Sequence, residues 1–182
     1  MKRLKTLIKY VLIILVYLGF RFYIGGYYFS KEKCDEATMR SLYANETIHV
    51  MDFTEKNKSI SVYTNPEERT VSLIGSEKKG FLYKGMNSLA SQPINDEPIS
   101  VITMWVSDFR GEILLVYRND PNVSTIEIDQ LDGTTILWGW KDDFAGWILK
   151  QDDVYKNTCK AFDDQGNLIA EIPLNVVEEI EY

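Results

Sequence analysis

Alternation of apolar and polar residues is the main pattern of the chain after its first quarter. It shows most simply in three short runs, at residues 60–62, 71–73 and 126–128. A period of two places the apolar side chains of a run on one face of a half-buried strand. Two continuous apolar runs, at 99–106 and 113–117, are typical of central strands. The pattern therefore predicts a sheet-forming domain.

Turn-forming residues separate these runs, and several of the turns contain Gly or Asn, which adopt a positive φ at low cost. Strands at such short spacing, with few helical interruptions, predict an antiparallel β domain. Residues 86–98 are the longest stretch without a predicted strand and are expected to form a short helix or a loop. The predicted strands are Thr47–Phe53, Ser59–Tyr63, Thr70–Ser76, Phe81–Lys84, Ile99–Val106, Glu112–Arg118, Ser124–Ile128, Thr135–Trp140, Gly146–Leu149, Thr158–Asp163 and Leu168–Ile172.

The first 30 residues follow a different pattern. Four cations, the last of them Lys9, lead into an apolar and aromatic run, and no acidic residue occurs before Glu32. Tyr10–Phe29 contains a single charge, Arg21, and a helix needs about 20 mostly apolar residues to cross a hydrocarbon core of about 30 Å. The strictly uncharged centre, Tyr10–Phe20, has 11 residues, a length that also suits the centre of a cleaved signal peptide.

We predict that residues 1–30 form an uncleaved signal anchor, because the residues after the apolar centre are mostly bulky and a cleavage site requires small ones. Cleavage remains the alternative. The cationic flank predicts a cytoplasmic N-terminus, with residues 7–29 in contact with the membrane. The expected fold is thus mainly β with one N-terminal transmembrane helix. Residues 31–182 would form an antiparallel β-rich extracytoplasmic domain that begins with a short helix at 31–45.

Charge divides the chain at the same place. Residues 31–182 contain 15 Lys and Arg residues against 27 Asp and Glu residues, a formal charge of −12. An acidic domain has no electrostatic attraction for nucleic acid, so DNA and RNA are excluded as main partners. The acidic tail at 176–182 is expected to be loose.

The sequence offers little that indicates catalysis or a cofactor. His49 is the only histidine, and the chain lacks the nucleophile-elbow, phosphate-loop, dinucleotide and zinc-protease motifs. Residues 163–167 are acidic, but they lack the length and the distal Glu of a calcium loop, so a hairpin turn is expected. No catalytic residue, metal site or cofactor is predicted.

The two cysteines, Cys34 and Cys159, leave two possibilities open. Outside the cytoplasm they could form a disulfide that ties the start of the domain to its last hairpin. They could equally remain thiols, because the sequence does not show whether their Cα atoms approach within bonding reach.

Tryptophans are the most distinctive local feature. Trp138, Trp140 and Trp147 lie within 13 residues of one another, at 137–149. Exposed aromatic side chains on a β surface often bind sugars or peptides, because they provide a large contact area at little cost in entropy. The alternative is that these rings fill the core. Trp138, Trp140 and Trp147 are therefore the candidate ligand-binding residues.

Several segments of the second half follow one another in a recognisable order. They are Arg118-Asn-Asp-Pro-Asn-Val123, residues 126–128, residues 136–138 and the closing hairpin at 160–169. Together they cover roughly residues 113–172. In this order they resemble a group of uncharacterised membrane-anchored or secreted β-rich proteins of Gram-positive bacteria of the bacillus type. The resemblance implies a fold type and a location, and it implies no activity.

The sequence as a whole predicts a membrane-anchored extracytoplasmic binding or accessory module of the cell envelope. Catalysis is not inferred. One alternative is a cell-wall hydrolase that uses paired carboxylates. The other is a regulatory partner of another membrane protein, with the N-terminal segment making the contact.

Overall fold

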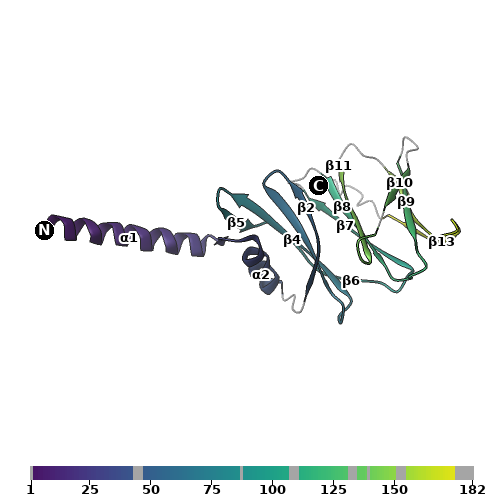
Figure 1. Cartoon of the computed structure of the whole chain (residues 1–182), viewed down its shortest axis with the longest axis horizontal. Helices are drawn as coiled ribbons and strands as arrows, with labels where there is room; N and C mark the ends of the chain where they lie inside the picture. The colour runs from purple at the N-terminus through teal and green to yellow at the C-terminus, as the bar shows by residue number, and fades with distance from the viewer. Residues whose placement is uncertain are drawn as a thin grey trace, which may run out of the picture. The chain divides into compact units, whose positions relative to one another are not determined.

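The computed structural model describes residues 2–42, 47–86, 88–106, 111–130, 135–138, 140–150 and 155–174. The chain is mainly β, and its described strands pair antiparallel. Two helices, both near the N-terminus, accompany the strands (Figure 1). The predicted antiparallel β-rich fold is confirmed. The predicted tail at 176–182 lies outside the described residues.

Each of the predicted strands is present, with small differences at the ends. The helix predicted at 31–45 is present but ends at Ser41, and residues 43–46 lie outside the described part of the chain. The elements are α1 (Lys2–Ile24), β1 (Tyr27–Tyr28), α2 (Lys31–Ser41), β2 (Ile48–Glu55), β3 (Lys58–Asn65), β4 (Thr70–Lys79), β5 (Leu82–Gly85), β6 (Leu89–Pro93), β7 (Ile99–Val106), β8 (Gly111–Arg118), β9 (Thr125–Gln130), β10 (Thr135–Trp138), β11 (Phe144–Lys150), β12 (Tyr155–Phe162) and β13 (Leu168–Pro173).

Two strands were not predicted. β6 lies in the segment expected to be a helix or a loop, and β1 lies within the expected anchor. β6 has no alternating pattern; pairing with β4 and a hydrogen bond of 2.8 Å between the hydroxyls of Ser72 and Ser91 hold it in place. β1 is two residues long and pairs with β5. Tertiary pairing therefore decides both strands, and local sequence does not.

The chain divides into two compact units. The first contains Met1–Tyr63 and Ser72–Ser91, and the second contains Thr64–Val71 and Gln92–Tyr182. Neither boundary falls at residue 30, so this division does not test the expected domains 1–30 and 31–182.

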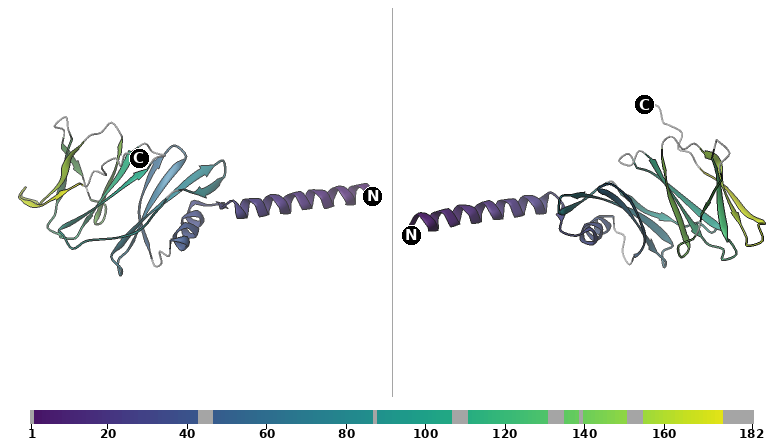
Figure 2. Two further views of the ribbon diagram at one scale, coloured as in Figure 1. Left: turned by 180° about the vertical axis from the view of Figure 1, so that it is seen from behind. Right: turned by 45° about the horizontal axis from the view of Figure 1, so that its top comes forward.

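The first unit is built on a sheet with the strand order β1-β5-β4-β3-β2, and β6 pairs with β4 beside this path. α2 packs on this sheet (Figure 2). Ser30 caps α2, because its hydroxyl accepts a hydrogen bond from the backbone N–H of Lys33 at 3.3 Å. Alternation in β3 and β4 buries Ile60, Val62 and Leu73.

The second unit is a two-layer sandwich. One sheet has the order β10-β9-β12-β13, and the other has the order β11-β8-β7. Both sheets contribute side chains to one core. Its buried residues are Ile99, Leu114, Val116, Val123, Ile126, Ile128, Ala145, Cys159, Ala161 and Leu174.

The predicted transmembrane helix receives no support. Within the described residues, no helix is both long and apolar enough to cross a membrane.

Candidate functional site

Trp140 follows β10 and is held against the core of the second unit. Its indole Nε1 donates a hydrogen bond to the carbonyl oxygen of Ser124 at 2.7 Å. The guanidinium of Arg118 lies 5.2 Å from the ring centroid. The ring is half-buried and packs against the core residues. A buried indole N–H usually has a hydrogen-bond partner, and a cation over the ring adds an attraction, so these contacts favour a packing role.

The other two candidate tryptophans lie in different sheets. Trp138 is on β10 opposite Ile126 of β9, and its side chain lies outside the described part of the structure. Trp147 is on β11 opposite Leu114 of β8, and it is 48% exposed. Strand pairing thus places Trp138 and Trp147 on separate sheets, with Trp140 in the segment between them.

Trp147 shares a sheet face with Trp105, which the sequence did not single out. Trp147 lies opposite Leu114, and Leu114 lies opposite Thr103. Trp105 is two residues beyond Thr103 and lies opposite Glu112. Opposed residues share a face, as do residues two apart along a strand. Trp105, Glu112 and Trp147 therefore project from one face, and we call them the Trp105–Trp147 surface.

The Trp105–Trp147 surface continues the core-facing side of the sheet. Leu114, on the same face, is fully buried in the sandwich core, whereas Trp105 is 54% exposed. β8 lies between β7 and β11, so the strands that carry the two tryptophans are about 10 Å apart. The apolar face of the sheet thus ends in two half-exposed indoles.

Glu112 places a carboxyl group on this aromatic surface. The side chain is half-buried, and burial raises its pKa above the ordinary value, although a hydrogen bond with Thr103 opposes the shift. A carboxyl group with a raised pKa accepts hydrogen bonds when ionised and donates one when protonated. The surface therefore combines two indole rings on which a ligand can stack with one carboxyl group that can accept or donate a hydrogen bond.

The sequence signal for this site was present but ambiguous. The apolar run at 99–106 predicts a central strand and does not single out Trp105. Register alone shows that Trp105 lies opposite Glu112 and near Trp147. Because the pairing of β7 with β8 and of β8 with β11 is tertiary information, spacing along the chain could not provide it.

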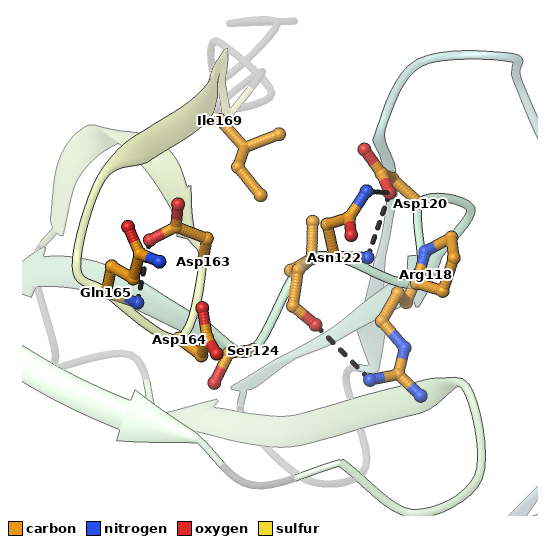
Figure 3. A pocket seen from close by; sticks show the side chains of 10 residues that line it. Arg118, Asp120, Asn122, Ser124, Asp163, Asp164, Gln165 and Ile169 are labelled. Atoms are coloured by element: carbon orange, nitrogen blue, oxygen red, sulfur yellow. Dashed lines mark hydrogen bonds between the residues drawn. The ribbon is translucent and has the colours of Figure 1, made fainter.

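A hollow lies beside the β12–β13 turn in the second unit. Its volume is about 730 Å³, and it is lined by residues of segments 118–124 and 163–169 (Figure 3). The Asp163 carboxylate accepts hydrogen bonds from the backbone N–H groups of Gln165 and Asn167, at 2.9 and 2.7 Å. Asp120 likewise accepts from the backbone of Asn122 at 2.9 Å. These are turn-stabilising bonds, and they confirm the predicted hairpin turn at 163–167.

A polar cluster lies between α2 and strands β2 and β3 of the first unit. The Lys31 ammonium contacts Asp35 Oδ2 at 3.2 Å, Asp52 Oδ1 at 2.8 Å and the Ser61 hydroxyl at 2.5 Å. Asp35 is 1% exposed. It also accepts hydrogen bonds from Ser61 and Tyr63, at 2.9 and 3.2 Å. One cation thus links two carboxylates and a serine.

The charge states in this cluster favour a structural clamp over catalysis. Burial alone would lower the pKa of Lys31, but the two carboxylates outweigh it and the net shift is upward. Burial would raise the pKa of Asp52, but hydrogen bonds from Lys31 and His49 outweigh it and the net shift is downward. These shifts favour the charged form of both groups, whereas a base at Lys31 or a general acid at Asp52 would need the neutral form.

His49 belongs to the edge of the same cluster. Its Nε2 lies 3.1 Å from Asp52 Oδ1, and its ring meets Tyr63 edge-on, at 5.3 Å between centroids. Burial raises the pKa of Tyr63, and Asp35 adds to the shift, so the phenol stays neutral.

Both cysteines are free, buried thiols. Cys34 is on α2 in the first unit, and Cys159 is on β12 in the core of the second. The disulfide is the other of the two possibilities that the sequence left open. Among the described residues, no three His, Cys, Asp or Glu side chains are grouped so that they could hold a metal ion.

The chain matches no protein-family model, no curated protein and no solved structure.

Proposed function

We propose that the chain is a membrane-anchored, extracytoplasmic binding module whose ligand site is the Trp105–Trp147 surface. The observation that carries the proposal is the register of β7, β8 and β11, which sets two half-exposed indoles on either side of a half-buried carboxyl group. Exposed aromatic patches on a protein surface mark interaction sites.

An extended sugar polymer fits this surface best. Indoles on strands about 10 Å apart can each stack on a sugar ring, and stacking tolerates variation along a repeating chain. Glu112 can accept hydrogen bonds from sugar hydroxyls between the two rings. The acidic charge of residues 31–182, −12, disfavours an anionic polymer and is compatible with a neutral one.

The anchor proposal rests on the surface of α1. Large apolar side chains are exposed all around the helix, from Ile8 to Ile24. A helix that is apolar on every side requires an apolar environment. The long stems of Lys9 and Arg21 can carry their charges to the headgroups and so extend the length of helix that a bilayer accepts. We therefore place α1 in the bilayer, with its cationic N-terminus on the cytoplasmic side.

The ligand site is tested with the full chain in vesicles and oligosaccharides of N-acetylglucosamine as the probe. Trp105→Ala and Trp147→Ala should each weaken binding about fivefold to tenfold, the value of roughly one aromatic contact. Leu168→Ala removes an exposed apolar side chain on the other sheet of the same unit and is the matched control. Equal binding by all four proteins would contradict the proposal.

The alternative functions, a cell-wall hydrolase and a regulatory partner of another membrane protein, are tested alongside. Cleavage of the probe would point to the hydrolase, whereas binding without cleavage supports the module. Flotation of the vesicles examines the anchor, because the full chain should rise with them and resist extraction at high pH. Co-purification with another membrane protein in mild detergent, lost when residues 1–30 are replaced by another anchor, would favour the regulatory partner.

A further inference from the structure

Two phenylalanines of the first unit are exposed and stacked on each other. Phe29, five residues after the end of α1, is 80% exposed, and Phe81 is 73% exposed. Their ring centroids are 6.4 Å apart, with an angle of 21° between the planes. Two phenyl rings that stack and remain this exposed gain little from folding, and they form a small apolar knob on the surface.

Phe81 owes its position to the turn between β4 and β5. Lys79 pairs with Leu82, so Gly80 and Phe81 form a two-residue hairpin loop. Gly80 has a φ of +66°, as the first loop position of a tight hairpin requires. The second position needs no particular side chain, so the turn does not explain a phenylalanine at its tip.

Three lysines lie on the β4–β5 hairpin that carries Phe81, and one of them, Lys79, pairs with Glu77 at 3.1 Å. Residues 77–84 contain Lys78, Lys79 and Lys84 against one acid, Glu77, within a domain of formal charge −12. Lys78 and Lys79 are exposed. Lys84 lies 5.6 Å from the ring centroid of Tyr27 on β1, the strand that joins α1 to α2. A basic and aromatic patch thus lies next to the proposed anchor in an otherwise acidic domain.

We propose that Phe29, Phe81 and the lysines of the β4–β5 hairpin dock on the surface of an anionic bilayer. The phenyl rings enter the interfacial region, where aromatic side chains are favoured. The lysines meet lipid phosphates, and this attraction offsets the repulsion between an acidic domain and the same surface. The inference rests on the proposed anchoring by α1, which brings the hairpin to the membrane, and it adds a second contact that orients the first unit.

The test uses the full chain in vesicles that contain a nitroxide-labelled lipid. Phe81→Trp places a reporter at the hairpin tip, and the fluorescence of the parent chain is subtracted. Ile48→Trp is the matched control, because Ile48 is exposed on β2, the opposite edge strand of the same sheet. Quenching at position 81 should exceed quenching at position 48 severalfold in vesicles with anionic lipid. It should fall in zwitterionic vesicles, in 1 M salt, where the Debye length shrinks to about 3 Å, and with Lys78→Glu and Lys79→Glu.

Flotation of each sample separates the two proposals. A chain that floats but shows equal quenching at positions 48 and 81 overturns the docking surface and leaves the anchor intact. A chain that does not float overturns the anchor itself. Quenching at position 81 that ignores lipid charge, salt and the lysine substitutions overturns the role given to the lysines.

Discussion

At the scale of single residues, the surroundings of a side chain decide its chemistry. Glu112 is one of 27 acids in the sequence, and nothing in its local sequence marks it. Its place opposite Trp105 in the β7–β8 pair removes it partly from water and raises its pKa. Trp140 shows the reverse case: it belongs to the most distinctive sequence cluster, yet its contacts with Ser124 and Arg118 use its indole for packing.

Glu112→Gln is expected to remove a pH-dependent part of the free energy of unfolding. The folded-state pKa is raised above the unfolded value of about 4.3. The folded chain therefore binds the proton more tightly, and this contribution to stability is lost as the pH rises from about 4.3 through the folded pKa. Denaturant unfolding across this range should show wild type losing stability relative to Glu112→Gln. Parallel pH profiles for the two proteins would contradict the burial of this carboxyl group.

The cysteines provide a second prediction at the residue scale. Burial is the main cause that raises the pKa of the Cys34 thiol to about 11 and of the Cys159 thiol to about 12. A neutral, buried thiol reacts slowly, so the native chain should resist a thiol reagent. In denaturant without reductant, both thiols should titrate if they are free. Their absence from that titration would instead establish the disulfide considered from the sequence.

At the scale of elements, patterning predicted strands where a strand has its own amphipathic face. β3, β4 and β9 follow from alternation, and β7 and β8 follow from continuous apolar runs. β1 and β6 could not be found in this way, because they are short and exist through their partners β5 and β4. The Trp105–Trp147 surface could not be predicted from the sequence for the same reason, because it depends on which strands pair and in what register.

α2 illustrates an element fixed by charge as well as by apolar packing. Lys31→Met keeps an apolar stem but removes the ammonium that contacts the buried carboxylate of Asp35. The free energy of unfolding should fall by about 2–3 kcal/mol, because a hydrogen-bonded ion pair loses its cation. Lys33→Met, at an exposed position of α2, is the control and should change it by less than about 0.5 kcal/mol. Equal effects in chemical denaturation would argue against the clamp.

The polar cluster around Lys31 predicts that the free energy of unfolding depends on pH in the acid range. Asp52 has a lowered pKa because its hydrogen bonds with Lys31 and His49 outweigh burial. Its contribution to stability is present above its unfolded pKa of about 3.9 and is lost as the pH falls through the lowered folded value. Asp52→Asn should therefore destabilise the chain at neutral pH and become progressively less harmful in strong acid. If Asp52→Asn destabilises the chain by the same amount at neutral pH and in strong acid, the lowered pKa of Asp52 is contradicted.

At the scale of the whole molecule, the break near residue 30 separates a cationic, apolar helix from an acidic β-rich region. No helix among the described residues is long and apolar enough to cross a membrane, and the large apolar side chains of α1 between Ile8 and Ile24 are exposed. The basic hairpin at 77–84 and the Trp105–Trp147 surface belong to different units. The proposed membrane contact therefore lies in the first unit and the proposed ligand contact in the second.

Binding of N-acetylglucosamine oligosaccharides by the vesicle-bound full chain is the most direct test of the central claim. The Trp105→Ala/Trp147→Ala double variant should bind at least about tenfold more weakly than wild type. Its unfolding midpoint should stay close to that of wild type, since both rings are about half exposed. Wild-type affinity in a folded double variant would contradict the account.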